Sequence, residues 1–205
     1  MDVIEKNKLR MNQLSASAPK LAEQIKGLDW DELTVALNEC IFHPNQSVLP
    51  KEYGPASYLP LEAENEEQDE LYVRAFTHGE SIIRDGKTAA FTVAGGQGTR
   101  LGYNGPKGTL PVSPIKGKTL FQLFAEQILG ISRKYEVIIP WYVMCSPLNL
   151  GATLAHFEKM DFYGLGRGNL KFFAQSVMPA TDFEGNLLLA DSNSLALSPD
   201  GHGGS

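Results

Sequence analysis

Hydrophobic residues recur at helical intervals through the first part of the chain. The aspartates Asp29 and Asp31 supply a helix start signal within this pattern. The positions that carry the pattern are Leu14, Leu21, Ile25, Leu33 and Leu37. We therefore predict a helical, loop-rich N-terminal segment over residues 1–85.

A proline-rich connector and an acidic run interrupt this segment. The connector, HPNQSVLPKEYGPASYLP, covers residues 43–60, and the acidic run, EAENEEQDE, covers residues 62–70. The acidic run is either a partner-binding surface or the solvated start of a helix. The second is favoured, because acidic side chains stabilise the positive end of a helix dipole. An amphipathic helix is predicted over residues 69–85, with apolar positions Leu71, Ala75, Ile82 and Ile83.

From residue 88 onward, short apolar runs alternate with amphipathic helices. In order, the segments are a strand at 89–94, a helix that begins near 118–119, a strand at 137–144 that contains Pro140, a helix at 150–160 and a strand at 170–175. This order predicts an α/β domain over residues 86–205, with a Rossmann-like, mostly parallel sheet, right-handed crossovers and helices on both faces. A hairpin with its turn at 184–186 follows, and we expect it to shape the rim of the ligand site. In such sheets ligands bind outside the carboxyl ends of the strands.

Composition narrows the class of ligand and partner. The 205 residues are 42% hydrophobic and 20% charged, as in soluble globular proteins, and the formal net charge is −6. This acidity argues against a nucleic-acid partner, because phosphate backbones are bound by basic surfaces. Cys40 and Cys145 form no disulfide framework, and the sequence contains neither a secretory signal nor an apolar run that could span a bilayer. We expect a cytoplasmic protein with no membrane segment.

The stretch AGGQGTRLG, at residues 94–102, follows the first predicted strand directly. Its glycines let backbone N–H groups approach an anion without a Cβ in the way. The spacing matches neither the dinucleotide-binding fingerprint nor the P-loop. Arg100 inside the stretch and Lys107 shortly after it add two cations, and cations with amides suit a triphosphate. The alternative interpretation is a glycine-rich connector with surface cations.

Five stretches of the chain occur in an order that is typical of one enzyme family. They are GKTAAFTVAGGQGTRLGYNGPKG, KTLFQLFAEQI, IPWYVMCS, FYGLGRGNLKFFAQSVMPA and LSPDGHGG, and the similarity runs from about Leu71 to the last residue. Together they resemble the eukaryotic-type UDP-sugar pyrophosphorylase family. The string IPWYVM, with FF-x-Q-x-x-x-PA and PDG-x-GG, is similar to the N-acetylhexosamine branch. GYNGPKGTLPV and the histidine of PDGHGG are similar to the broader UDP-sugar and glucose branches.

The resemblance implies a nucleotidyltransferase with a GT-A-like fold, and it assigns roles to individual residues. Arg100 and Lys107 are the implied catalytic residues, with Lys107 stabilising charge on the α-phosphate. Gln175 is implied to hydrogen-bond the uracil edge, and His202 to stand near the sugar phosphate. The implied nucleotide-binding residues are Ala94, Gly95 and Gly96 along the uracil and ribose, Gly98 and Thr99 around the triphosphate, and also Gln97, Gln175 and Gly201. As alternatives, Gln175 is an ordinary strand-end residue, Gly201 a turn glycine and His202 a surface residue.

The implied reaction joins UTP and a sugar-1-phosphate, either N-acetylglucosamine-1-phosphate or glucose-1-phosphate. A sugar phosphate oxygen attacks the α-phosphorus of UTP in line, and pyrophosphate leaves. Mg²⁺ or Mn²⁺ is the implied cofactor, and its aspartate ligand is expected in a C-terminal half beyond PDGHGG, which this chain lacks. Two alternatives stay open: a nucleotide-binding fragment or regulatory module without turnover, and a module for a nucleotide other than UTP.

Overall fold

The structure, a computed structural model, describes residues 2–44, 50 and 52–199, and it divides into two units. The first unit takes its described residues from Met1–Pro55 and Val177–Asp200, and the second from Ala56–Ser176. No helix in the described part of the chain combines the length and apolar character that a membrane span requires. Each unit has its own hydrophobic core.

Three helices and two small hairpin-like sheets form the first unit. The helices are α1 (Val3–Ser15), α2 (Pro19–Lys26) and α3 (Trp30–Leu37), and α3 continues into a short π-helical turn, η1 (Asn38–Phe42). The predicted start signal is confirmed, because the Asp29 carboxylate accepts hydrogen bonds from the backbone N–H groups of Asp31 and Glu32, both at 3.0 Å. Of the predicted hydrophobic positions, Leu21, Ile25, Leu33 and Leu37 are buried, and Leu14 is partly exposed.

The strands of the first unit come from the other end of the chain. β4 (Val177–Pro179) pairs with β7 (Leu197–Pro199), and β5 (Leu189–Asp191) pairs with β6 (Ser194–Leu195), both antiparallel. The predicted turn at 184–186 is present: Asp182 and Asn186 are joined by a backbone hydrogen bond of 3.0 Å. Leu187 and Leu195 complete the core of the helices.

Asn7 ties α1 to this hairpin region. Its side chain is 1% exposed, donates to the Gly185 carbonyl at 2.8 Å and accepts from the Leu187 N–H at 3.0 Å. The helices therefore bury their apolar side against residues nearly 180 positions later.

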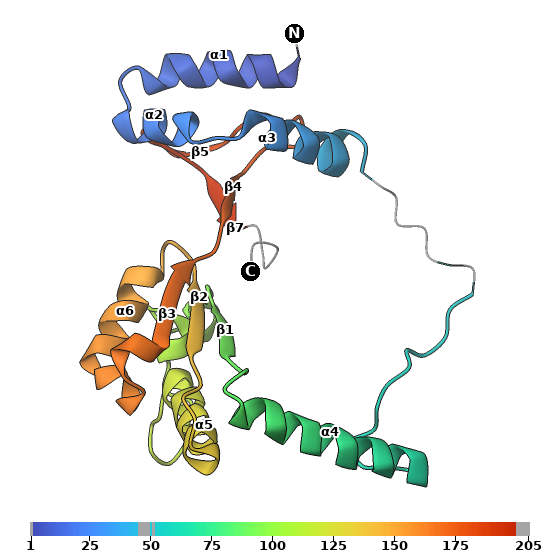
Figure 1. The fold of residues 1–205 in the computed structure, drawn as a ribbon. Helices are drawn as coiled ribbons and strands as arrows, with labels where there is room; N and C mark the ends of the chain where they lie inside the picture. Colours follow the sequence, from blue (N-terminus) through green and yellow to red (C-terminus); the bar gives the residue numbers. More distant parts are fainter. Residues whose placement is uncertain (1, 45–49, 51, 200–205) are drawn as a thin grey trace. The chain divides into compact units, whose positions relative to one another are not determined.

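The second unit contains the predicted parallel sheet. Its strands are β1 (Ala90–Ala94), β2 (Trp141–Cys145) and β3 (Leu170–Ala174), all parallel and in the order β1-β2-β3, and its connecting helices are α5 (Leu120–Tyr135) and α6 (Leu150–Lys159) (Figure 1). The β-α-β-α-β order is confirmed. The second strand begins at Trp141 rather than at Val137. Pro140, which precedes it, has no N–H for a ladder and contributes its carbonyl to Ala90 N at 2.9 Å.

The two connecting helices cover the same face of the sheet. The ring centroids of Phe121 in α5 and Phe157 in α6 lie 4.9 Å apart, and those of Phe157 and Trp141 in β2 lie 5.4 Å apart. On the opposite face Phe91 is 51% exposed and Tyr142 is 40% exposed. Two crossovers of the same hand that advance in the same direction place their helices on one side. We expected helices on both faces of the sheet, and α5 and α6 together cover one of them.

The acidic run forms a helix start, as predicted. Helix α4 (Glu66–Arg84) has Glu66, Glu67 and Asp69 in its first turn, and the Asn65 side chain caps it by accepting from Gln68 N at 2.9 Å. Of the proline-rich connector before it, residues 45–49 and 51 lie outside the described residues, and residues 52–60 form neither helix nor strand.

The two units divide the chain differently from the expected boundary between residues 85 and 86. Helix α4 belongs with the sheet, because Tyr135 at the end of α5 donates a hydrogen bond of 2.6 Å to Glu80. Residues 177–199 belong with the N-terminal helices, because Leu187 and Leu195 fill their core.

Candidate functional site

The three parallel strands end next to one another. Gly95 follows β1, Ser146 follows β2 and Gln175 follows β3, and the Gln175 N–H donates to the Cys145 carbonyl at 2.7 Å. A Cβ on Gly95 would lie 2.6 Å from Gln175 Oε1 and 3.4 Å from the Ser146 nitrogen. Only glycine leaves room for the Gln175 carboxamide there. The predicted site residues Gly95 and Gln175 are thus in contact.

The chain after Gly95 forms a closed loop that returns beside its own start. Gln97 and Pro106 form an antiparallel bridge, with hydrogen bonds from Gly98 N to the Gly105 carbonyl at 2.9 Å and from Lys107 N to the Gly96 carbonyl at 3.0 Å. We call residues 95–108 the glycine loop. Lys107 Nζ comes within 3.8 Å of the position that a Cβ on Gly96 would occupy. The structure therefore brings Lys107 next to Gly96, which is eleven positions earlier.

The Gly98 amide already has a hydrogen-bond partner within the glycine loop. Because its N–H donates to Gly105, this amide closes the loop. A phosphate would then be contacted by other amides and by the two cations. Thr99 and Arg100 lie in the exposed turn η2 (Thr99–Leu101), and Ala94 is the last residue of β1.

Tyr103 holds the middle of the glycine loop, and the sequence analysis missed it. Its ring lies where a Cβ on Gly98 would be, with Cδ1 at 2.8 Å, and also faces Gly105, with Cε1 at 3.1 Å. Its hydroxyl shares a hydrogen bond of 2.8 Å with Thr109 Oγ1, which in turn donates to the Pro106 carbonyl at 2.8 Å. An aromatic residue among loop glycines was the available signal.

The end of the glycine loop packs on the first turn of α5. In the turn η3 (Lys107–Thr109), a Cβ on Gly108 would lie 2.2 to 2.5 Å from atoms of the Phe121 ring, which is itself 1% exposed. The backbone next to Lys107 therefore packs directly against the hydrophobic core. A hollow of about 230 Å³ adjoins it, lined by Thr92, Val93, Ala94, Gly96, Lys107, Gly108, Leu120, Phe121 and Phe124.

Both predicted cations are exposed and have no carboxylate partner among the described residues. Among the described residues, the cations that form ion pairs are Lys8, Arg84, Lys87, Lys118 and Lys134. Arg100 and Lys107 therefore keep their charge available for an anion.

Asn149 is a second residue that the sequence analysis missed. It is 0% exposed at the start of α6, and its side-chain amide donates to the Gly95 carbonyl at 2.8 Å. Its position four residues after the end of a parallel strand, at the start of the following helix, was the available signal.

Several carboxylates and the cysteine that follow strands have structural roles. Asp182 accepts from the N–H groups of Glu184 and Asn186, and Asp191 accepts from Asn193. Hydrogen bonds, chiefly from the Asn186 side chain, lower the pKa of Asp182. Cys145 is buried, and this burial raises the pKa of its thiol and favours the protonated form.

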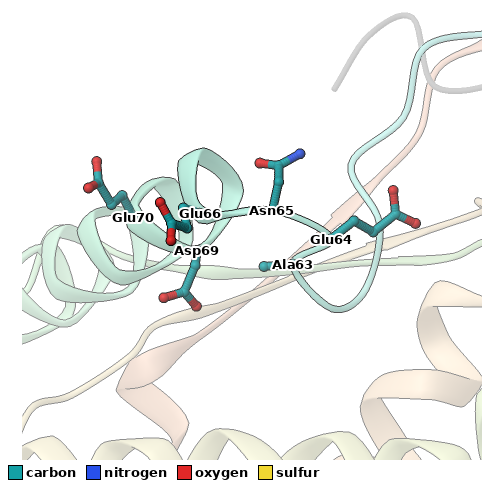
Figure 2. Close-up of a pocket in the computed structure, with 6 residues that line it drawn as sticks. All are labelled: Ala63, Glu64, Asn65, Glu66, Asp69 and Glu70. Atoms are coloured by element: carbon teal, nitrogen blue, oxygen red, sulfur yellow. The ribbon is translucent and has the colours of Figure 1, made fainter.

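A larger hollow, of about 520 Å³, lies at the start of α4 and is acidic (Figure 2). It is lined by Ala63, Glu64, Asn65, Glu66, Asp69 and Glu70. Its carboxylates repel phosphate, so it does not suit a nucleotide. Over residues 2–44, 50 and 52–199, no three histidine, cysteine, aspartate or glutamate side chains are placed to hold a metal ion. The predicted residues Gly201 and His202 lie outside the described residues.

These observations define a parallel α/β protein with a closed glycine loop after its first strand, the place where such sheets usually bind ligands. The model of the UTP–glucose-1-phosphate uridylyltransferase family matches residues 50–205. This chain therefore belongs to that family, and the resemblance found in the sequence is confirmed.

Individual relatives and a solved structure agree with this assignment. The probable UDP-N-acetylglucosamine pyrophosphorylase of Schizosaccharomyces pombe is 32% identical over 209 residues, covering 97% of this chain and 42% of that protein. The UDP-N-acetylglucosamine pyrophosphorylase of Saccharomyces cerevisiae is 38% identical over 154 residues, covering 73% of this chain and 31% of that protein. The crystal structure of uridine diphosphate N-acetylglucosamine pyrophosphorylase from Trypanosoma brucei superposes with a TM-score of 0.59 at 27% identity, over 66% of this chain and 29% of that chain. The chain thus spans less than half the length of the relatives that it matches.

Proposed function

We propose that this chain is the nucleotide-binding part of a uridylyltransferase, which forms a UDP-sugar and pyrophosphate from UTP and a sugar-1-phosphate. One observation carries the proposal: Gln175 lies against Gly95, and Lys107 lies beside Gly96, at the carboxyl edge of one parallel sheet. A polar group for a base and a cation for phosphates therefore flank a single pair of glycines.

The two sides of the pair have separate roles. On the base side, the Gln175 carboxamide hydrogen-bonds the uracil edge, and Ala94, Gly95 and Gly96 lie along the uracil and ribose. On the phosphate side, Arg100 and Lys107 hold the triphosphate together with amides of the glycine loop, among them those of Gln97 and Thr99. Gln175 is the reason for choosing uracil, because a site that hydrogen-bonds one base edge rejects bases that leave its polar groups unpaired.

The protein contributes position and electrostatics to the reaction. An oxygen of the sugar phosphate attacks the α-phosphorus of UTP in line, the bond to the β-phosphate oxygen breaks, and pyrophosphate leaves. Lys107 neutralises charge that develops on the α-phosphate, and the packing of Gly108 against Phe121 fixes the backbone from which its side chain extends. The buried thiol of Cys145 takes no part.

N-acetylglucosamine-1-phosphate is the sugar phosphate that we favour, and glucose-1-phosphate is the second choice. The S. pombe and S. cerevisiae relatives are named for N-acetylglucosamine, whereas the family model is named for glucose-1-phosphate. His202 near the sugar phosphate and Gly201 against the base are part of this proposal. They follow from the sequence resemblance alone.

Mg²⁺ or Mn²⁺ is the cofactor that we propose for the whole enzyme. The described residues do not fit a metal site by themselves, so we assign no step to the ion. The relatives are more than twice as long as the part that this chain matches. We expect the metal ligand to come from the additional part of the enzyme. The two free cysteines, Cys40 and Cys145, support a cytoplasmic location.

Equilibrium titration with UTP, CTP, ATP and GTP, each with and without Mg²⁺, tests the proposal. We expect selective binding of UTP that is weakened by Lys107→Ala and loses its selectivity in Gln175→Ala. Lys171→Ala is the matched control, because Lys171 is an exposed lysine of β3. Absence of UTP binding by the parent chain would contradict the proposal. Binding of UTP without conversion of either sugar phosphate would instead favour a nucleotide-binding module without turnover.

A further inference from the structure

The side chain of Asn149 hydrogen-bonds the glycine loop rather than the first turn of its own helix. It occupies the N-cap position of α6 but makes no side-chain cap hydrogen bond there. Its Nδ2 instead donates to the Gly95 carbonyl at 2.8 Å, across to the end of β1. Asparagine is favoured at N-caps because it accepts from the first turn of the helix. This one therefore departs from the usual role.

The hydrogen bond sets the direction of a peptide group that is otherwise free to turn. The Gly95–Gly96 peptide joins two glycines, and it is trans, as are all the described peptide bonds. In a planar trans peptide the carbonyl and the N–H point in opposite directions. With its carbonyl held toward Asn149 and α6, the peptide directs the Gly96 N–H to the other side, away from α6.

Asn149 is itself held firmly. It is completely buried, and its backbone N–H is bound to the Ser146 carbonyl at 3.0 Å and to Ser146 Oγ at 3.2 Å. Its Oδ1 atom is buried and accepts no hydrogen bond in the described structure. An unpaired buried oxygen is unfavourable for stability, and Asn149 caps no N–H of α6, so its bond to Gly95 is the contact that explains this side chain.

The phosphate side of the loop is held by different residues. There, Gly98 N bonds to the Gly105 carbonyl, and the Tyr103 ring packs on both of these glycines. Asn149 makes its hydrogen bond at the Gly95 end of the loop. A change at Asn149 therefore acts on one end of the loop.

We propose that Asn149 is a positioning residue for the base side of the site: it orients the Gly95–Gly96 peptide against which uridine binds, and leaves the phosphate side unaffected. This inference rests on the proposed function, because the base side is assigned there. The ligand class is the nucleoside part of UTP, in contrast to its phosphate chain.

The test compares three ligands on the chain and its Asn149→Ala variant: UTP, UMP and inorganic tripolyphosphate. We expect UTP and UMP to bind about tenfold more weakly, the size expected for losing one hydrogen bond to a buried carbonyl, and tripolyphosphate to change less than about twofold. Asn149→Leu, which removes the donor and keeps a branched side chain of similar shape without adding a charge, is the second variant and should give the same pattern. Thermal unfolding of each variant shows that it is folded at the assay temperature.

Asn169→Ala is the matched control. The Asn169 side chain also donates to a backbone carbonyl at 2.8 Å, that of Leu165, but it precedes β3 and lies far along the chain from the glycine loop. Its removal should lower stability without changing the affinity for any of the three ligands.

The outcomes separate the inference from the proposed function. If the parent chain binds no UTP, the proposed function fails and the inference falls with it. If the parent binds UTP but both Asn149 variants match it, only the inference is overturned. Equal weakening of UTP and tripolyphosphate, or unfolding of both Asn149 variants while Asn169→Ala stays folded, would show that Asn149 is structural for the whole unit and would also overturn it.

Discussion

The carboxamide of Gln175 occupies the space that a side chain on Gly95 would need. A Cβ at residue 95 would come within 2.6 Å of Gln175 Oε1. β1 and β3 do not pair with each other, so this contact spans the width of β2 at the carboxyl edge of the sheet. The identity of residue 95 therefore controls where the predicted uracil-binding amide lies.

Gly95→Ala should displace Gln175 and reduce discrimination between nucleotides. Because the clash is with the far end of a flexible side chain, we expect the fold to survive and the UTP-to-CTP affinity ratio to fall about tenfold, equivalent to about 1.4 kcal/mol. Competition titration measures the ratio. Gly130→Ala is the control: residue 130 lies within α5 with nothing within 4 Å of its Cβ position, and alanine there should raise stability by about 0.5–1 kcal/mol. An unchanged ratio in Gly95→Ala would argue against Gln175 as the base-selecting residue.

Tyr103 variants should act on the phosphate side of the glycine loop. Tyr103→Phe keeps the ring against Gly98 but removes the hydroxyl that meets Thr109, and should lower the free energy of unfolding by about 1 kcal/mol. Tyr103→Ala removes the ring as well, so tripolyphosphate and UTP should both bind about tenfold more weakly. Urea unfolding and titration separate the two effects. Full tripolyphosphate affinity in Tyr103→Ala would mean that loop closure does not need the ring.

Gly108→Ala should be more damaging than a single methyl group suggests. The new Cβ would overlap the Phe121 ring, which is 1% exposed and packs against the rings of Phe157 in α6 and Trp141 in β2. Overpacking of this kind costs about 1–3 kcal/mol, and it moves Lys107. We expect a lower melting temperature together with weaker UTP binding.

A double-mutant cycle checks the reason for that loss. Gly108→Ala combined with Phe121→Leu should destabilise less than the sum of the two single changes, because the smaller side chain relieves the overlap. Gly168→Ala, at a position with nothing within 4 Å of its Cβ position, should be close to neutral. Strict additivity of the two changes would contradict the proposed overlap.

His156 should make the stability of the second unit depend on pH. Its imidazole Nε2 lies 2.6 Å from the Tyr163 hydroxyl, which lies 3.1 Å from Thr119 Oγ1 at the start of α5. Burial, with a smaller contribution from Lys159, lowers the pKa of His156 below its ordinary value of 6.5. The unfolded chain therefore binds this proton at a higher pH than the folded chain does.

The free energy of unfolding should consequently fall as the pH drops through 6.5 toward the folded pKa. The contribution of His156 to stability should be fully present above pH 6.5. The slope of the free energy of unfolding against pH that it causes should not exceed about 1.4 kcal/mol per pH unit. Urea titrations between pH 5 and pH 8 measure the slope, and His156→Gln should flatten it relative to the parent chain. A parent whose stability rises on acidification through this range would contradict the prediction.

Local patterns predicted much of this structure because their causes are local. Asp29 and Thr119 precede helices whose first N–H groups they cap, and the alternation from residue 89 to residue 175 fixes a parallel sheet through the need for crossovers. The glycine loop was found because glycines and cations directly follow a strand.

Features that depend on distant contacts could not be predicted. The pairing of Asn7 with Gly185 has no local signal, and it moves residues 177–199 into a different unit from the expected one. The apolar residues Phe91 and Tyr142 look like core positions in the sequence but lie on the exposed face, since strand order rather than hydropathy decides which face the helices cover. Asn149 and Tyr103 were missed because each acts through one carbonyl or one packing contact of the glycine loop.

The bond between Asn7 and Gly185 also has a consequence for how the protein is made. During synthesis α1, α2 and α3 leave the ribosome well before Leu187 and Leu195, which close their core. Until then the helices have apolar sides without a partner, while the sheet between them in the chain can already assemble. These three helices are therefore a target for a chaperone that binds nascent chains until residues 187–195 have been made.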